Sequence, residues 1–213
     1  MTYLPKHFEV ADLAACQALA QAHPLATWVM PHDGELLVNH IPWLLDMERG
    51  EHGTLVGHVA RANPVWQVVG EAIGVAVFQG SEAYISPNWY PSKQAHGKAV
   101  PTWNYEVVHA HGVARMFEDR ERLRALVAAL TARHEAHQAQ PWQLSDAPAD
   151  YIELMLDAIV GIEIPVTRWV GKRKASQNRP RADREGVAQG LRARAWPLDT
   201  AMAALVEPEP RRD

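Results

Sequence analysis

Residues 25–41, LATWVMPHDGELLVNHI, contain two runs of strand-forming residues on either side of a tight-turn signal. The first run is Leu25–Met30 and the second is Glu35–Ile41. Asp33-Gly34 lies between them, and glycine adopts the positive φ of a tight hairpin turn at little cost. Pro42 ends the second run because proline lacks the backbone N–H that a sheet uses. The stretch therefore predicts an antiparallel hairpin.

Further strand candidates follow this hairpin along the chain. Their ranges are Gly53–Ala60, Glu71–Gln79, Ala83–Ser86, Trp103–Phe117 and Gly161–Val170. Side chains of a strand alternate between two faces, so His109 and His111 are expected on one face. Ser86–Pro101 is expected to be a loop of about 15 residues, a length typical of functional loops. Gly171–Arg181 is expected to be a polar, basic loop.

Helical spacing of apolar residues marks the other elements. The expected helices are Ala11–Ala22, a segment after Glu118-Asp119 that contains Leu123–Leu130, a segment capped by Asp146 with Pro148 in its first turn, Asp183–Leu191 and Leu198–Val206. Six or seven short antiparallel strands predict a barrel. Helices grouped between the late strands favour a mainly β or α+β fold over a doubly wound sheet. The fold class predicted from the residues is therefore an antiparallel β-barrel with flanking helices.

Length and composition favour one ordinary globular domain. The chain has 213 residues, 47% hydrophobic and 22% charged, which predicts one domain over residues 1–206 and a disordered tail at 207–213. Its single cysteine, Cys16, excludes an internal disulfide. No apolar run reaches the roughly 18 residues of a membrane span. The first residues lack the pattern of a signal peptide, so we expect a cytoplasmic protein with no membrane partner.

Positive charge is concentrated near the C-terminal end. The segment Arg168–Arg194 holds nine Lys and Arg against two acids, a net charge of +7, whereas the whole chain carries −4. Such asymmetry predicts an anionic partner for this segment. A solvated basic surface is the alternative.

Several common catalytic and metal sites are missing from the sequence. It has no G-x-x-x-x-G-K-[ST], no G-x-G-x-x-G and no G-x-S-x-G. In His134-Glu135-Ala136-His137 the second histidine comes one residue too early for a zinc-binding H-E-x-x-H helix. His109 and His111, with His58 as a third ligand, leave a metal site open, but polar residues lining a barrel rim or interface are the stronger explanation. We therefore predict no metal.

Three segments carry groups suited to a phosphorylated planar ligand. Arg61 and Asn63, in the turn after Gly53–Ala60, supply donors to an anion, although a surface arginine is the simpler explanation. Trp103-Asn104-Tyr105 combines a stacking ring with hydrogen-bonding groups, unless Trp103 lies in the core. Lys172–Arg179, KRKASQNR, joins cations for a phosphate to amides for imide and carbonyl edges, or forms a solvated face.

Ten short motifs, some of them within these segments, follow one another in a specific order along the chain. They include YLPKHF at 3–8, AHPL at 22–25, NHIP at 39–42, GHVARANP at 57–64, FQG at 78–80, YISP at 84–87, WYPSK at 89–93, VPTWNY at 100–105, GIEI at 161–164 and KASQNR at 174–179. Over about Tyr3 to Leu191 the chain resembles the PaiB-type family of FMN-binding negative transcriptional regulators. Ala175 departs from the pattern, since a larger apolar residue is expected there.

The resemblance implies a six- to seven-stranded antiparallel split β-barrel of the pyridoxamine-phosphate-oxidase-like kind. It also implies FMN as cofactor and a homodimer with FMN between the subunits. The residues that it assigns to the cofactor are His58, Arg61, Asn63, Thr102, Trp103, Asn104, Tyr105, Lys174, Gln177 and Asn178. The strand ending in His58 and Arg61 would meet the phosphate or ribityl chain, and Thr102–Tyr105 would lie near the ring. Lys174, Gln177 and Asn178 could come from the partner subunit.

Two functions remain open after the resemblance. The family implies a negative transcriptional regulator that works as a flavin-linked sensor. In this interpretation Arg168–Arg194 contacts DNA or a protein. The alternative is a flavin-dependent oxidoreductase that acts on a small molecule without direct DNA binding. The flavin itself would carry the chemistry, so the sequence identifies no catalytic residue. A weaker option is haem handling, with His58, His109 and His111 as ligands.

Overall fold

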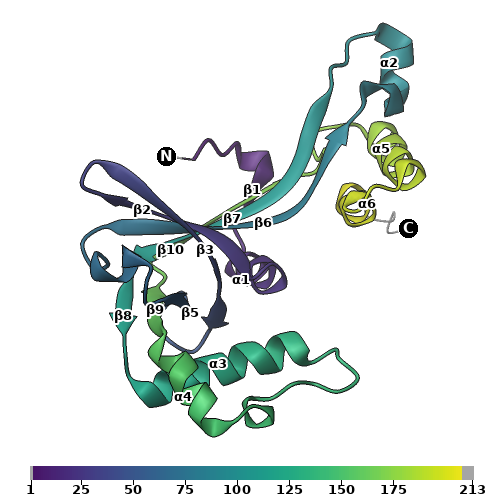
Figure 1. Ribbon diagram of the computed structural model, residues 1–213. Coiled ribbons are helices and arrows are strands. Elements are labelled where there is room, and N and C mark those ends of the chain that lie inside the picture. The colour runs from purple at the N-terminus through teal and green to yellow at the C-terminus, as the bar shows by residue number, and fades with distance from the viewer. Residues whose placement is uncertain (1, 208–213) are drawn as a thin grey trace. The chain divides into compact units, whose positions relative to one another are not determined.

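The computed structural model describes residues 2–207, whose strands form one six-stranded and one four-stranded sheet (Figure 1). The strands are β1 (Glu9–Val10), β2 (Leu25–His32), β3 (Glu35–Pro42), β4 (Leu44–Asp46), β5 (Thr54–Ala60), β6 (Ile73–Ile85), β7 (Thr102–Val113), β8 (Arg115–Phe117), β9 (Ile159–Pro165) and β10 (Arg168–Lys174). The α-helices are α1 (Leu13–Ala22), α2 (Pro91–His96), α3 (Arg120–Glu135), α4 (Ala149–Asp157), α5 (Arg181–Arg194) and α6 (Asp199–Val206). Short 3₁₀ helices are η1 (Lys6–Phe8), η2 (Pro64–Gln67), η3 (Pro87–Trp89) and η4 (Leu144–Asp146).

The chain divides into two compact units. The first contains Met1–Ala22, Gln79–Val108 and Val170–Asp213, and the second contains His23–Phe78 and His109–Trp169. Strands β6 and β7 run through both units. The single domain over residues 1–206 stays a prediction. The predicted tail, except Glu207, lies outside the described residues.

The hairpin of residues 25–41 is present in the second unit. Strands β2 and β3 pair antiparallel from Leu25↔Pro42 to His32↔Glu35. Asp33 and Gly34 form the turn with φ of 49° and 82°. Strand β2 also pairs with β6 through Thr27↔Val77 and Val29↔Val75. The two strand-forming runs and Asp33-Gly34 therefore predicted this hairpin, although β2 continues to His32 and β3 includes Pro42.

The second unit also holds the four-stranded sheet, in the order β4-β5-β9-β8. Helices α3 and α4 pack together and bury Leu123, Leu126 and Leu156 with Phe117 (Figure 1). The chain passes from β7 in one sheet to β8 in the other at Ala114, where we expected one continuous strand. Glycine is required just before this crossing, because a Cβ at Gly112 would lie 2.4 Å from the Pro165 carbonyl oxygen.

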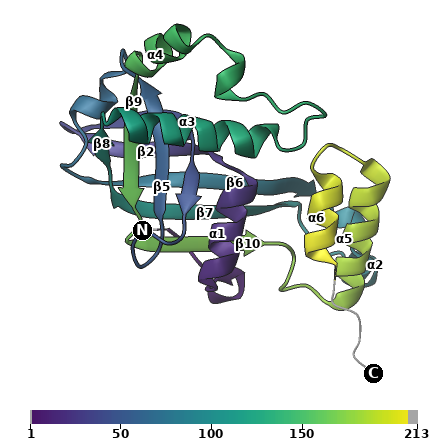
Figure 2. The ribbon, with the colours of Figure 1, turned by 90° about the horizontal axis from the view of Figure 1, so that it is seen from below.

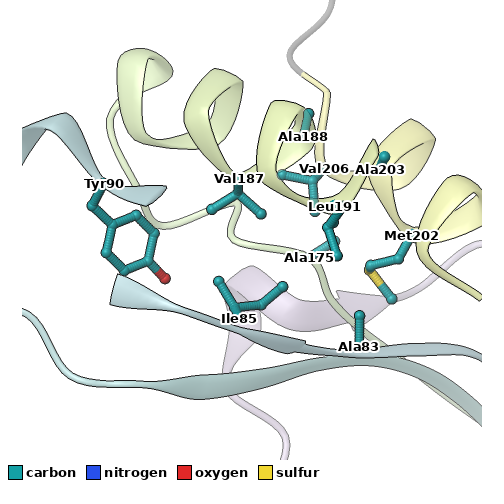
Figure 3. Close-up of a cluster of buried hydrophobic side chains, with 10 residues drawn as sticks. All are labelled: Ala83, Ile85, Tyr90, Ala175, Val187, Ala188, Leu191, Met202, Ala203 and Val206. Atoms are coloured by element: carbon teal, nitrogen blue, oxygen red, sulfur yellow. The ribbon is translucent and has the colours of Figure 1, made fainter. Parts of the chain in front are cut away.

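In the first unit, β10 lies between β1 and β7. Helices α5 and α6 lie side by side (Figures 1 and 2). A buried apolar cluster joins them to β6 and to the segment after β10 (Figure 3). Its members are Ala83, Ile85, Tyr90, Ala175, Val187, Ala188, Leu191, Met202, Ala203 and Val206. Ala175 is fully buried in this cluster.

Several predicted boundaries are wrong. Glu71–Gln79 and Ala83–Ser86 form the single strand β6, which continues past the buried residues Gly80 and Ser81. The predicted loop Ser86–Pro101 contains η3 and α2, and the predicted strand Gly161–Val170 is divided between β9 and β10. Pairing between strands distant in sequence decides such boundaries, and a local pattern does not contain it.

The basic loop and one helix cap also differ from the prediction. Gly171–Lys174 belongs to β10, because Gly171 and Lys172 pair with Val10 and Glu9 of β1. Asp146 lies in η4, where its carboxylate accepts a hydrogen bond from the backbone N–H of Gln143 at 2.9 Å. Pro148 takes the N-cap position of α4 instead.

The predicted fold class is confirmed: the protein is α+β, with two antiparallel sheets of the split-barrel kind and flanking helices. Among the described residues, no helix is both long and apolar enough to span a bilayer.

Candidate functional site

In the first unit, the ammonium of Lys174 lies against the start of β7. Its Nζ donates a hydrogen bond to Thr102 Oγ1 at 2.6 Å and another to the backbone oxygen of Trp103. Both acceptors are uncharged, so these contacts leave the positive charge uncompensated. The structure thus brings together three of the predicted site residues.

Two further cations lie near Lys174. Burial lowers the pKa of the Lys174 ammonium, and the charges of Lys172 and Arg179 lower it further. The Lys172 ammonium lies 5.4 Å from the centroid of the Tyr105 ring and 5.5 Å from that of Tyr3. A bound anion would relieve the repulsion within this group, so the group is suited to a phosphate.

An aromatic surface adjoins the cations. Trp103 is 54% exposed, so it is not a core residue, and its ring makes an edge contact with Tyr84 at 6.0 Å between centroids. Trp103 and Tyr105 line a pocket of about 330 Å³ together with Gln79, Glu82, Glu106 and Val107. An exposed indole beside a pocket offers a flat wall to a planar ring.

Two predicted ring donors are bonded within the protein instead. Asn104 is only 1% exposed, and its Nδ2 donates to Ser176 Oγ at 2.9 Å. Gln177 accepts from the backbone N–H of Ala175 at 2.7 Å and donates to the backbone oxygen of Arg173 at 2.5 Å. Asn178 is exposed. Asn104 and Gln177 therefore shape the turn after β10 in this structure.

The remaining predicted residues belong to the second unit. His58, on β5, has a buried Nδ1 without a hydrogen-bond partner among the described residues, and burial lowers its pKa. Asn63 donates to Asn39 Oδ1 at 2.7 Å and caps η2 by accepting from the Val65 N–H. It also lines a pocket of about 390 Å³ between β3 and η2. Asn63 is therefore placed at the wall of a pocket, whereas Nδ1 of His58 is buried.

Arg61 already has protein partners. Its guanidinium donates to Glu118 Oε1 at 2.5 Å and to the backbone oxygens of Asp157 at 2.7 Å and Ile159 at 3.2 Å. These bonds use three of its five N–H donors and leave two for a ligand. Arg61 therefore ties β5 to the end of α4 whether or not it also binds a phosphate.

Replacing Arg61 with alanine is expected to weaken FMN binding more than replacing His134 with alanine. The same change removes the bonds to Glu118 and to two carbonyls, which is expected to lower the free energy of unfolding by about 1–3 kcal/mol. Fluorescence titration with FMN and urea unfolding measure the two effects separately. Equal FMN affinities of the two variants would contradict the assignment of Arg61.

Metal and haem ligation have less support from the geometry. Among the described residues, no three or more His, Cys, Asp or Glu side chains are arranged to hold a metal ion. His109 and His111 have ring centroids 6.3 Å apart, and burial lowers the pKa of His111.

The residues assigned to the cofactor omitted Lys172 and Ser176, although both lie in the segment Lys172–Arg179 that the sequence singled out. Lys172 and Lys174 share one face of β10, which the period of two would have shown had Arg168–Lys174 been recognised as a strand. Ser176 has a φ of 61°, unusual for a residue other than glycine, and local sequence does not reveal it.

The residues of the first unit fit FMN. Lys174 and its neighbouring cations suit the phosphate, and Trp103 and Tyr105 suit the isoalloxazine ring. The fit rests on the positively charged donors of Lys174 and its neighbours and on the exposed indole of Trp103. Bound flavin would supply hydride or electron transfer, while the protein holds and orients it.

These features define a split-barrel α+β protein with a site suited to a flavin nucleotide. The chain belongs to the PaiB-type FMN-binding family: residues 2–168 match the family model described as "Putative FMN-binding domain". It is 32% identical over 206 residues to "Protease synthase and sporulation protein PAI 2" of Bacillus subtilis, covering 96% of each chain. It is also 34% identical to an uncharacterised protein of Emericella nidulans, covering 89% of this chain and 90% of the relative.

A solved structure shares the fold. It is the FAD and heme binding protein from Mycobacterium smegmatis, with a TM-score of 0.54 and 15% identity, covering 78% of this chain and 73% of that one. At this identity the likeness concerns the fold alone. Family membership supports FMN as the cofactor. Lys174, Gln177 and Asn178 lie beyond the range matched by the family model but within the β10–α5 region of this chain.

Proposed function

We propose that this chain is a cytoplasmic, homodimeric FMN-binding protein of the PaiB type that acts as a flavin-linked regulator. The observation that carries the proposal is the uncompensated ammonium of Lys174, which donates to the backbone oxygen of Trp103, a residue that is 54% exposed. In the proposed complex, Lys174 binds the phosphate of FMN and Trp103 lies against its ring. The redox state of the flavin is then the signal.

An exposed apolar face of the second unit supports the homodimer. Strands β2, β3 and β6 carry aliphatic side chains there on one side of the sheet, opposite the buried core residues Trp28 and Phe78. The aligned residues are Val29, Pro31, Leu36, Val38, Ile73, Val75 and Val77. Leu36 and Val38 are 67% and 54% exposed. Soluble monomers rarely expose contiguous apolar surface of this kind, and a second copy would cover it with an identical patch.

The contacts of the basic segment argue against direct DNA binding through α5. Four of its arginines are paired with carboxylates: Arg173 with Glu106, Arg181 with Glu185, Arg192 with Glu207 and Arg194 with Asp199. Three of these acids lie outside Arg168–Arg194, so they compensate part of the segment's positive charge. Arg184 donates to the backbone oxygens of Val206 and Glu207. We therefore propose that the protein regulates through a small molecule or a partner protein, and that the state of the flavin controls this interaction.

The same ion pairs favour a second candidate function, that of a flavin-dependent oxidoreductase. A flavin-dependent oxidoreductase acting on a small molecule needs the flavin site but no nucleic-acid surface. The pocket of about 330 Å³ beside Trp103 has room for a small ligand.

The visible absorption spectrum tests flavin binding, and a gel shift tests direct DNA binding. A purified protein that is colourless and does not quench the fluorescence of added FMN would overturn the flavin proposal. We expect no shift of its own promoter DNA by the purified protein at low salt, where phosphate contacts are strongest. A shift at low salt that disappears steeply as salt rises would show direct DNA binding and contradict this part of the proposal.

A further inference from the structure

The turn after β10 is fastened to β7 by one buried hydrogen bond. Asn104 Nδ2 donates to Ser176 Oγ at 2.9 Å, and these residues are 1% and 4% exposed. Ser176 comes two residues after Lys174, and Asn104 comes between Trp103 and Tyr105. The bond therefore joins the backbone segment that carries the cation to the strand that carries the aromatic wall.

The rest of the turn is held in one conformation from both sides. Both Oε1 and Nε2 of Gln177 bond to backbone groups of the turn and of β10. The backbone N–H of Arg179 donates to the backbone oxygen of Ser176 at 2.9 Å. Ala175 is buried in the apolar cluster of the first unit (Figure 3). Ser176 adopts a φ of 61°, a conformation that costs energy for a residue with a side chain and persists only when its surroundings hold it.

On the opposite face of β10, Arg173 is anchored too. Its Nε donates to Glu106 Oε1 at 2.6 Å, and Glu106 is 6% exposed. Residues 173 and 176 are thus both tied to β7, by an ion pair and by the Asn104 bond. Lys174 lies between these two anchors.

We propose that Asn104 and Ser176 are positioning residues that hold Lys174 in place for the phosphate of FMN, and that Asn104 does not itself contact the flavin. This inference rests on the proposed function, because Lys174 must be the phosphate ligand. Asn104 lies on the buried face of β7, opposite the exposed Trp103, and its amide donates a hydrogen bond to Ser176.

The test compares the affinities of each variant for FMN and for riboflavin, which lacks the phosphate. We expect Asn104→Ala and Ser176→Gly each to lower the ratio of FMN to riboflavin affinity about three- to tenfold, the effect of one neutral hydrogen bond. The double variant is expected to be no worse than either single one, since both remove the same bond. Glycine suits the positive φ at position 176, so Ser176→Gly removes the hydroxyl without adding backbone strain.

Ser92→Ala is the matched control. The Ser92 hydroxyl donates to the buried carboxylate of Asp183 at 2.6 Å in the same unit, so its loss destabilises the fold without touching the turn. Its affinity ratio is expected to stay at the wild-type value. If Asn104→Ala does not fold, Ser176→Gly alone decides the question.

The outcomes distinguish this inference from the proposed function. If Lys174→Gln lowers the ratio but Asn104→Ala and Ser176→Gly do not, the positioning role is wrong and the phosphate site stands. If Lys174→Gln leaves the ratio unchanged, the phosphate assignment fails and the positioning role fails with it. If Ser92→Ala lowers the ratio as much as Ser176→Gly, the effect reflects general destabilisation and the inference is overturned.

Discussion

Replacing Lys174 with glutamine is expected to weaken FMN binding by about ten- to hundredfold and to leave riboflavin binding nearly unchanged. A hydrogen bond to a charged group contributes about 1.5–3 kcal/mol, and each 1.4 kcal/mol corresponds to about a factor of ten in affinity. Glutamine keeps a polar end that can still donate to Thr102 Oγ1, so the local structure is preserved while the charge is removed. Quenching of flavin fluorescence measures both affinities.

Lys98→Gln is the control for this substitution. Lys98 is exposed in the same unit, and its replacement makes the same change in net charge. Its FMN affinity is expected to match that of the wild type. Riboflavin and FMN affinities that fall together in Lys174→Gln would show that Lys174 contacts the ring or stabilises the fold, and the phosphate assignment would be wrong.

Replacing Val38 with glutamate is expected to raise the dissociation constant of the dimer by at least about a hundredfold. Because the family resemblance implies that FMN lies between the two subunits, the monomer is also expected to lose FMN binding at micromolar protein. A carboxylate buried without a partner at an interface costs several kcal/mol. Val38 is 54% exposed in the single chain, so the substitution is expected to leave the fold of each subunit unchanged. Light scattering coupled to size-exclusion chromatography gives the oligomeric state, and the visible spectrum gives the flavin content.

Leu154→Glu tests whether any exposed apolar-to-acidic change has this effect. Leu154 is 61% exposed on α4, away from the apolar face of β2, β3 and β6. This variant is expected to remain a dimer that binds FMN. A wild-type protein that is monomeric at micromolar concentration, or a Val38→Glu variant that stays dimeric, would rule out this face as the dimer interface.

Local signals predicted the fold wherever neighbouring residues decide the structure. Asp33-Gly34 specified its hairpin because a tight turn requires positive φ at these positions. The alternation predicted for Trp103–Phe117 is present in β7, where His109 and His111 lie on the less buried face. The break between β9 and β10 was missed, because it depends on pairing with strands far away in the chain.

The candidate site was predicted as a set of residue types but not as a set of contacts. Lys174, Thr102 and Trp103 do lie together. Asn104 and Gln177 were expected to face the flavin ring, yet their amides bond to Ser176 and to the turn after β10. Whether an amide is free or used depends on partners up to 72 residues away, and spacing in the sequence does not encode them.

The sequence by itself determined the family, the strand-rich α+β class and the residues able to bind a flavin phosphate and ring. These follow from residue types, periodicity and the order of motifs, which are properties of the chain before it folds. Only the tertiary structure decided which charges remain available. Arg173 and Arg194 are paired with Glu106 and Asp199, which lie outside the basic segment, whereas the Lys174 ammonium donates to two uncharged oxygens. Charge compensation depends on distances between atoms, and folding alone sets those distances.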